Sequence, residues 1–219
     1  VVQAFQIIKQ VLFAVKEVHE AGFLHLDIQD GNVFIKGSLS EEDKLVSLVD
    51  FGAARPVCED GLCPAIRDRA LFSTIGFESP EIVGRNDGTL RLGAESDLYS
   101  VGYLLLLMLT GKRYTQRELD SANIGLYLSK RKLKKLNCPA HMADKVHQII
   151  SKALKKTPEE RYHSCEEMLA DVSDLIHALQ PYKSDLSQVV YDAFICYRHG
   201  KTDSQAAKIL QQKLEHFHI

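Results

Sequence analysis

Residues 25–32, with the sequence HLDIQDGN, gather side chains that could handle phosphate groups. The segment follows a long stretch with helical apolar spacing and precedes a short β-like run. Asp27 and Asn32 offer carboxylate and amide oxygens, which are the ligands that Mg²⁺ prefers. Aspartate and asparagine are also common in plain turns. This segment alone is therefore equally consistent with a structural turn and with a chemical site.

A second junction of this kind, Asp50-Phe51-Gly52, directly follows another β-like run and begins 18 residues beyond Asn32. Phosphoryl transfer needs metal ions on the phosphates, one group that orients the nucleophile, and accurate positioning. Carboxylate and amide groups held at strand ends would supply the metal ligands and the orienting group. The sequence places three such groups, Asp27, Asn32 and Asp50, beside predicted strand ends.

Five motifs, in order along the chain, resemble the C-terminal lobe of a protein kinase. HLDIQDGN is similar to the catalytic loop, and Asp-Phe-Gly at 50–52 is similar to the metal-binding motif. TIGFESPE at 74–81 resembles the end of the activation segment. SDLYSVGYLLLLMLTG at 96–111 resembles the central helix, and LKKTPEERYHSCEEML at 154–169 resembles the late segment whose arginine pairs with the activation-segment glutamate.

The resemblance implies a chemical role for four residues, with ATP and Mg²⁺ as cofactors and a protein as substrate. Asp27 would orient the substrate hydroxyl and accept its proton. Asn32 and Asp50 would hold Mg²⁺ against the phosphates of ATP. Thr74 would form a hydrogen bond near Asp27 and would favour a serine or threonine acceptor.

Six further residues would have structural roles by the same resemblance: His25, Phe51, Gly52, Glu81, Asp97 and Arg161. His25 would pack the catalytic loop against Phe51. Asp97 would tie the backbone of that loop to the central helix. Glu81 and Arg161 would form an ion pair, for which the plain alternative is solvated surface charge.

Three departures from the kinase pattern count against activity. Leu26 stands where an arginine is usual, so activation by a phosphate paired to that arginine is not expected. Gln29 stands where serine/threonine kinases have a lysine that contacts the transferring phosphate, and a missing cation weakens the stabilisation of developing charge. The sequence also contains no Gly-rich phosphate loop and no strand lysine, so this fragment alone is expected to be inactive.

The spacing of apolar residues predicts a mostly helical lobe. A helix over 1–21 is closed by Gly22, and one over 94–110 is ended by Gly111. Between them, two β-like runs form a hairpin and a long functional loop follows. The expected elements are strands at 32–37 and 45–50, the loop at 51–93, and further helices near 118–136, 142–155 and 164–179.

A second domain is expected to begin near the end of the sequence. YDAFICYRH at 191–199 resembles the first box of Toll/interleukin-receptor (TIR) domains, and a helical pattern follows at 203–217. The plain alternative is any buried strand before a helix. The expected fold class is α+β: a kinase C-terminal lobe over 1–179 without its N-terminal lobe, a linker over 180–189, and the first strand and helix of an α/β TIR-like domain over 190–219.

The composition excludes several other classes. The 219 residues are 45% apolar and carry a net charge of −2, which disfavours a dedicated nucleic-acid binder. No run approaches the roughly 18 apolar residues that span a bilayer. Five scattered cysteines suggest reduced thiols in a cytoplasmic protein. The sequence begins inside a helical pattern without methionine, so both ends are interpreted as cut.

These observations predict a serine/threonine-type protein kinase fragment in a signalling protein that could self-associate through its TIR part. A pseudokinase scaffold is the first alternative, because of Leu26 and Gln29. A small-molecule phosphotransferase shares the His-x-Asp and Asn pattern, but GFESPE and Arg161 argue against it. A TIR-centred NAD hydrolase or adaptor, regulated by the kinase lobe, is the alternative from another class.

Overall fold

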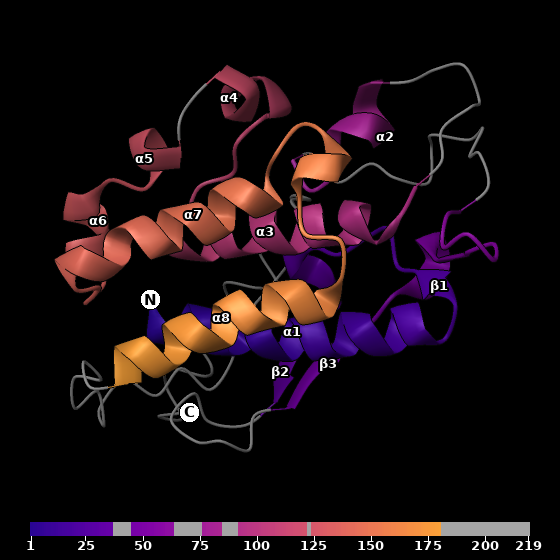
Figure 1. Cartoon of the computed structure of the whole chain (residues 1–219), viewed down its shortest axis with the longest axis horizontal. Helices are drawn as coiled ribbons and strands as arrows, with labels where there is room; N and C mark the ends of the chain where they lie inside the picture. The colour runs from indigo at the N-terminus through magenta and orange to yellow at the C-terminus, as the bar shows by residue number, and fades with distance from the viewer. Residues whose placement is uncertain (37–44, 64–75, 85–91, 122–123, 181–219) are drawn as a thin grey trace, which may run out of the picture.

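The computed structural model describes residues 1–36, 45–63, 76–84, 92–121 and 124–180 (Figure 1). The predicted linker and TIR-like segment lie outside these residues, as do Thr74 and the connection of the predicted hairpin. Within the described residues, no helix combines the length and the apolar character needed to cross a membrane.

Four long helices form the body of the lobe: α1 (Val2–Glu20), α3 (Ala94–Thr110), α7 (Ala143–Ala153) and α8 (Cys165–Leu179). Helix α3 packs against α1 on one side and against α7 on the other, while α8 lies along α1 (Figure 1). Most residues of α3 are buried, as expected for a helix that is apolar all round. Gly111, with a φ of 66°, ends α3 at the predicted position.

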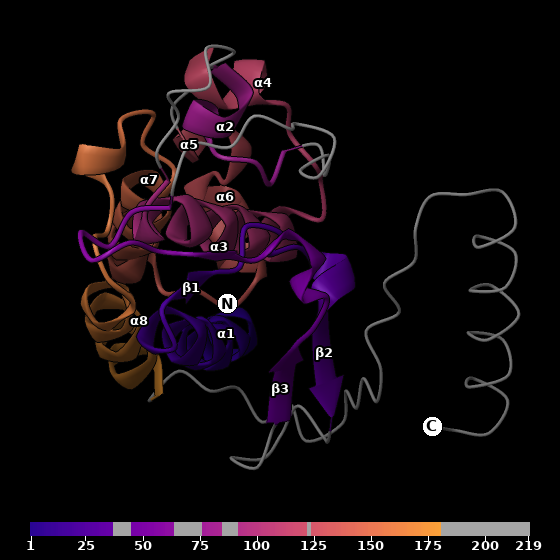
Figure 2. The same ribbon diagram turned by 90° about the vertical axis from the view of Figure 1, so that its right-hand side faces the viewer.

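Two short antiparallel sheets flank these helices. Strands β2 (Val33–Lys36) and β3 (Leu45–Leu48) pair as the predicted hairpin, and β3 packs against α1 (Figure 2). Strand β1 (Phe23–Leu24) pairs with β4 (Arg55–Pro56). This second pairing brings the start of HLDIQDGN next to the segment that follows Asp50.

The prediction of one helix near 118–136 is wrong. The chain instead forms three short helices, α4 (Gln116–Ser121), α5 (Ile124–Tyr127) and α6 (Lys130–Lys135). Ser129 is extended at the start of α6, and its Oγ accepts a hydrogen bond from the backbone N–H of Lys132 at 3.2 Å. The breaks let Ile124, Leu128 and Leu133 each turn toward the core.

The stretch 51–93, expected as loop, contains regular structure in its described part. Strand β4 and helix α2 (Pro80–Gly84) lie within it, and Cys63 forms an isolated antiparallel bridge with Leu92. The helices at 143–153 and 165–179 agree with prediction to within two residues. The described lobe therefore has the predicted mostly helical α+β character.

A buried ion pair joins α2 to the turn before α8. Arg161 is 1% exposed, and its Nη1 and Nη2 donate to Glu81 Oε1 and Oε2 at 2.8 and 2.7 Å. The remaining guanidinium contacts go to the backbone carbonyls of Lys155, Lys156 and Glu95. The ion pair predicted from the sequence is therefore present, with the buried cation fully hydrogen-bonded.

The titration of Glu81 reports on this pair. Burial raises the pKa of the Glu81 carboxyl, and the hydrogen bonds and charge of Arg161 lower it by more, so the net shift is downward. A lowered folded-state pKa stabilises the fold above the ordinary value of about 4.3. That contribution is lost as the pH falls through the lowered pKa of Glu81.

We expect Arg161→Met to lower the free energy of local unfolding around α3 by about 3–5 kcal/mol, because the Glu81 carboxylate stays buried without its cation. The double variant Glu81→Gln/Arg161→Met removes the uncompensated charge and should lose less. Hydrogen exchange of the α3 amides in the full chain measures both losses. A double variant that loses as much as or more than the single one would contradict this account.

Gly102 of α3 lies directly against Ala153 of α7. A Cβ atom added there would lie 2.4 Å from the Cβ of Ala153. We expect Gly102→Ala to push the helices apart and lower stability by roughly 1–3 kcal/mol. Thermal unfolding followed by helical circular dichroism measures the loss. Adding Ala153→Gly should restore part of the lost stability. If it restores none, the strain does not arise from the contact with Ala153.

Candidate active site

The segment 25–32 lies in a fixed position between two strand pairs. Gly22, with a φ of 80°, turns the chain out of α1, and β1 then pairs with β4. After the segment, β2 pairs with β3, and Asp50 follows β3 by two residues. The two polar junctions found in the sequence therefore lie side by side in the structure.

Asp97, in the first turn of α3, anchors this segment. Its fully buried carboxylate accepts hydrogen bonds from the backbone N–H groups of His25 and Leu26, both at 2.8 Å. His19 Nε2 lies 2.8 Å from the same carboxylate. A buried carboxylate needs such partners. The tie predicted between Asp97 and the loop backbone is therefore present, whereas the sequence did not single out His19.

Leu26 is buried and strained. Its φ is 61°, a left-handed conformation that costs a leucine roughly 1–2 kcal/mol. Its side chain is 7% exposed and belongs to an apolar cluster with Leu24, Ala53, Cys63, Ile82 and Leu92. The cluster joins the loop to the segment after Gly52 and to α2. Apolar packing thus fills the place where the kinase pattern has an arginine.

Asp27 is half-buried and receives two side-chain amides. Gln29 Nε2 lies 2.9 and 3.0 Å from its two carboxylate oxygens. Asn32 Nδ2 donates to the Asp27 carbonyl oxygen at 2.8 Å and to Asp27 Oδ2 at 2.9 Å. Asn32 is therefore fixed with its NH₂ group toward Asp27. The contact of Gln29 with both oxygens is a feature that the sequence did not reveal.

The register of the hairpin brings Asn32 and Asp50 to the same end. Val33 pairs with Leu48, and the backbone N–H of Val49 donates to the Asn32 carbonyl oxygen at 3.0 Å. Asp50 is exposed, and its Oδ1 accepts from the backbone N–H of Gly52 at 3.2 Å. An amide oxygen and a carboxylate at one hairpin end form a donor set that suits Mg²⁺.

His25 and Phe51 form the contact expected of them. His25 is fully buried, and its ring centroid lies 4.9 Å from that of Phe51 with the rings tilted by 53°. His25 Nδ1 accepts from the backbone N–H of Asp27 at 3.3 Å. Its Nε2 is buried without a hydrogen-bond partner among the described residues. His25 therefore braces the turn rather than facing a substrate.

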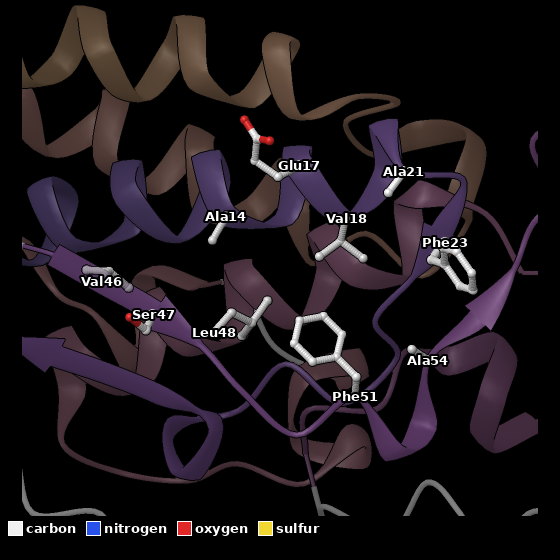
Figure 3. A pocket seen from close by; sticks show the side chains of 10 residues that line it. All are labelled: Ala14, Glu17, Val18, Ala21, Phe23, Val46, Ser47, Leu48, Phe51 and Ala54. Carbon is white, nitrogen blue, oxygen red and sulfur yellow. The ribbon is translucent and has the colours of Figure 1, made fainter.

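Phe51 also lines an apolar pocket of about 720 Å³ (Figure 3). Figure 3 shows Phe51 pointing toward Val18 and Leu48, between α1 and β3. The lining residues include neither Asp27, Asn32 nor Asp50. The pocket is thus a separate hollow beside the Asp-Phe-Gly segment and not the meeting point of the candidate ligands.

The protein kinase domain family matches residues 2–172. The chain is 26% identical over 171 residues to a probable serine/threonine-protein kinase PknB of Lactococcus lactis, covering 78% of this chain and 25% of the relative. It is 29% identical over 156 residues to serine/threonine-protein kinase PLK4 of Nematostella vectensis, a match that covers 71% of this chain and 14% of the relative. It is 27% identical over 191 residues to serine/threonine-protein kinase PknB of Mycolicibacterium smegmatis, a match that covers 87% of this chain and 28% of the relative.

The chain spans 14–28% of the length of these three relatives. The family match nonetheless covers most of the chain, and it includes every motif of the site described above. On this match, the chain belongs to the protein kinase family.

Proposed function

We propose that this lobe serves a serine/threonine-type protein kinase, which transfers the γ-phosphate of Mg·ATP to a protein hydroxyl. The observation that carries the proposal is the fixed arrangement of Asp27, Asn32 and Asp50 at two adjacent junctions. The three relatives are named as serine/threonine-protein kinases, which supports this acceptor class. Thr74, outside the described residues, is proposed to favour the same acceptors.

Asp27, Asn32 and Asp50 would each act through side-chain oxygen atoms. The Asp27 carboxylate would orient the acceptor hydroxyl and take its proton. Asn32, held by two hydrogen bonds to Asp27, would present its amide oxygen to Mg²⁺ together with the Asp50 carboxylate. When bound, ATP would supply the phosphoryl group, and Mg²⁺ would neutralise part of its charge.

A pseudokinase scaffold is the second candidate, and the Gln29 contact favours it. The Gln29 amide occupies both carboxylate oxygens of Asp27, where an acceptor hydroxyl would also have to bind. Gln29 is also neutral, so it offers no cation to the transferring phosphate. Under this alternative the lobe would bind partners without transferring phosphate.

The remaining parts of the proposal rest on the sequence alone. A TIR-like domain from residue 190 onward, self-association through it, and a cytoplasmic signalling role stay proposals, because residues 181–219 lie outside the described structure. A TIR-centred NAD hydrolase or adaptor would place the chemistry in that part. A small-molecule phosphotransferase is disfavoured by the Glu81–Arg161 pair of the protein-kinase pattern.

The deciding experiment follows transfer of labelled γ-phosphate by the full-length protein to a generic protein acceptor. We expect transfer by the wild type and a loss of at least about a hundredfold in Asp50→Asn, because a metal ligand is removed. Asp144→Asn, a surface carboxylate paired with Lys130, is the matched control and should keep full activity. No transfer by the wild type, with ATP still bound, would establish the scaffold alternative.

Replacing Gln29 by lysine tests how the site departs from the kinase pattern. We expect Gln29→Lys to raise the transfer rate by roughly tenfold, because the cation would stabilise developing charge. Gln29→Met, which removes the amide without adding charge, separates this effect from the release of Asp27. A rate that falls in both variants would mean that the Gln29–Asp27 contact belongs to the working site.

A further inference from the structure

Arg113 connects the candidate catalytic loop to the end of the activation segment. It lies in the turn between α3 and α4, and its Nη2 lies 2.7 and 2.8 Å from the two carboxylate oxygens of Asp30. Its guanidinium carbon lies 5.3 Å from the ring centroid of Phe77. Asp30 belongs to HLDIQDGN, and Phe77 belongs to TIGFESPE. One side chain therefore contacts both segments.

The ring that Arg113 contacts is itself immobilised. Phe77 is 2% exposed and packs edge-on against Tyr103, with ring centroids 4.7 Å apart. The backbone carbonyl of Phe77 accepts from Ser100 Oγ at 2.7 Å. Both Tyr103 and Ser100 project from α3. The far end of the contact is therefore fixed to the central helix.

The turn that carries Arg113 is fixed to the same place. Tyr103 Oη donates to the carbonyl oxygen of Tyr114 at 2.8 Å and accepts from its backbone N–H at 2.7 Å. A Cβ at Gly76, whose φ is 94°, would lie 2.4 Å from that hydroxyl. Arg113 and Phe77 thus share one rigid support, and Asp30 is the part that the guanidinium holds against it.

Asp30 is close in the chain to the proposed base. The backbone N–H of Asn32 donates to the Gln29 carbonyl oxygen at 3.0 Å, so residues 29–32 form one tight turn. Within that turn Gln29 and Asn32 both contact Asp27. A displacement of Asp30 would therefore move the two side chains that orient Asp27.

We propose that Arg113 is a positioning residue for phosphoryl transfer: through Asp30 and Phe77 it fixes Asp27 relative to the activation-segment end. This inference rests on the proposed kinase function. The side chains of Arg113 and Asp30 are 39% and 20% exposed, so the ion pair by itself is partly screened and modest. Because one nitrogen, Nη2, contacts both Asp30 oxygens, the added contact of the guanidinium with the Phe77 ring is what favours arginine over lysine here.

Hydrogen exchange tests the link without requiring catalysis. In the full-length protein, Arg113→Lys should speed exchange of the amides in 25–32 and 76–79 by roughly tenfold, because lysine keeps the charge but loses the guanidinium contact with the buried Phe77 ring. Asp30→Asn should do the same in 25–32, and the double variant should add little to either. Lys130→Gln, which breaks the exposed ion pair with Asp144, is the matched control and should leave both segments unchanged.

The kinetic test separates positioning from substrate contact. Arg113→Lys should lower kcat by about tenfold, following the same loss of contact, with the KM values for ATP and acceptor unchanged. A raised acceptor KM at constant kcat would make Arg113 a substrate contact and overturn the proposal. Unchanged exchange in both segments, or faster exchange throughout the lobe, would overturn it as well.

The two proposals fail in different ways. If the wild type transfers no phosphate, the kinase proposal fails, while the exchange experiment still reports whether Arg113 holds the two segments together. If the wild type is active and Arg113→Lys matches it in kcat and in exchange, only the positioning role fails.

Discussion

The buried carboxylate of Asp97 is the constraint on which the candidate site depends. It accepts hydrogen bonds from the backbone N–H groups of His25 and Leu26. Asp97 belongs to α3, a helix enclosed by the rest of the lobe. Without those two acceptor bonds, nothing local would favour a leucine in a left-handed conformation. The strained turn therefore exists because the buried Asp97 carboxylate needs hydrogen-bond donors. The carboxylate stabilises the turn, and the N–H groups of the turn stabilise the buried charge.

Helix α3 provides the reference frame for the activation-segment end too. Ser96 Oγ donates to Glu81, and the ring of Tyr99 lies 5.0 Å from the guanidinium carbon of Arg161. Ser100 and Tyr103 hold Phe77. The hydrophobic pattern of α3 does not explain the polar residues within it, whereas their contacts do. Here they tie the activation-segment end and the turn that carries Arg161 to a single rigid element.

The sequence predicts contacts best where a residue type leaves few choices of partner. Asp97 with the loop backbone, Glu81 with Arg161, and the pairing of the two β-like runs as a hairpin all follow from motif and pattern. It fails where the outcome depends on neighbours distant in the chain. The Gln29 contact with Asp27 depends on side-chain rotamers, and the division of 116–135 into three short helices depends on which face meets the core. Neither is encoded in local spacing.

The departures from the kinase pattern form one consistent change in how the loop is held. A cation is absent at Leu26 and at Gln29, while within the described residues Arg113 contacts the loop through Asp30. Leu26 instead packs with Ala53 and Ile82, so the loop and the segments after Gly52 and around α2 are joined by apolar contact. Apolar burial, unlike a phosphate–arginine pair, is present without any modification. A phosphate added to the activation segment would find no cation at Leu26, so activation by a phosphate–arginine pair at this position is not expected.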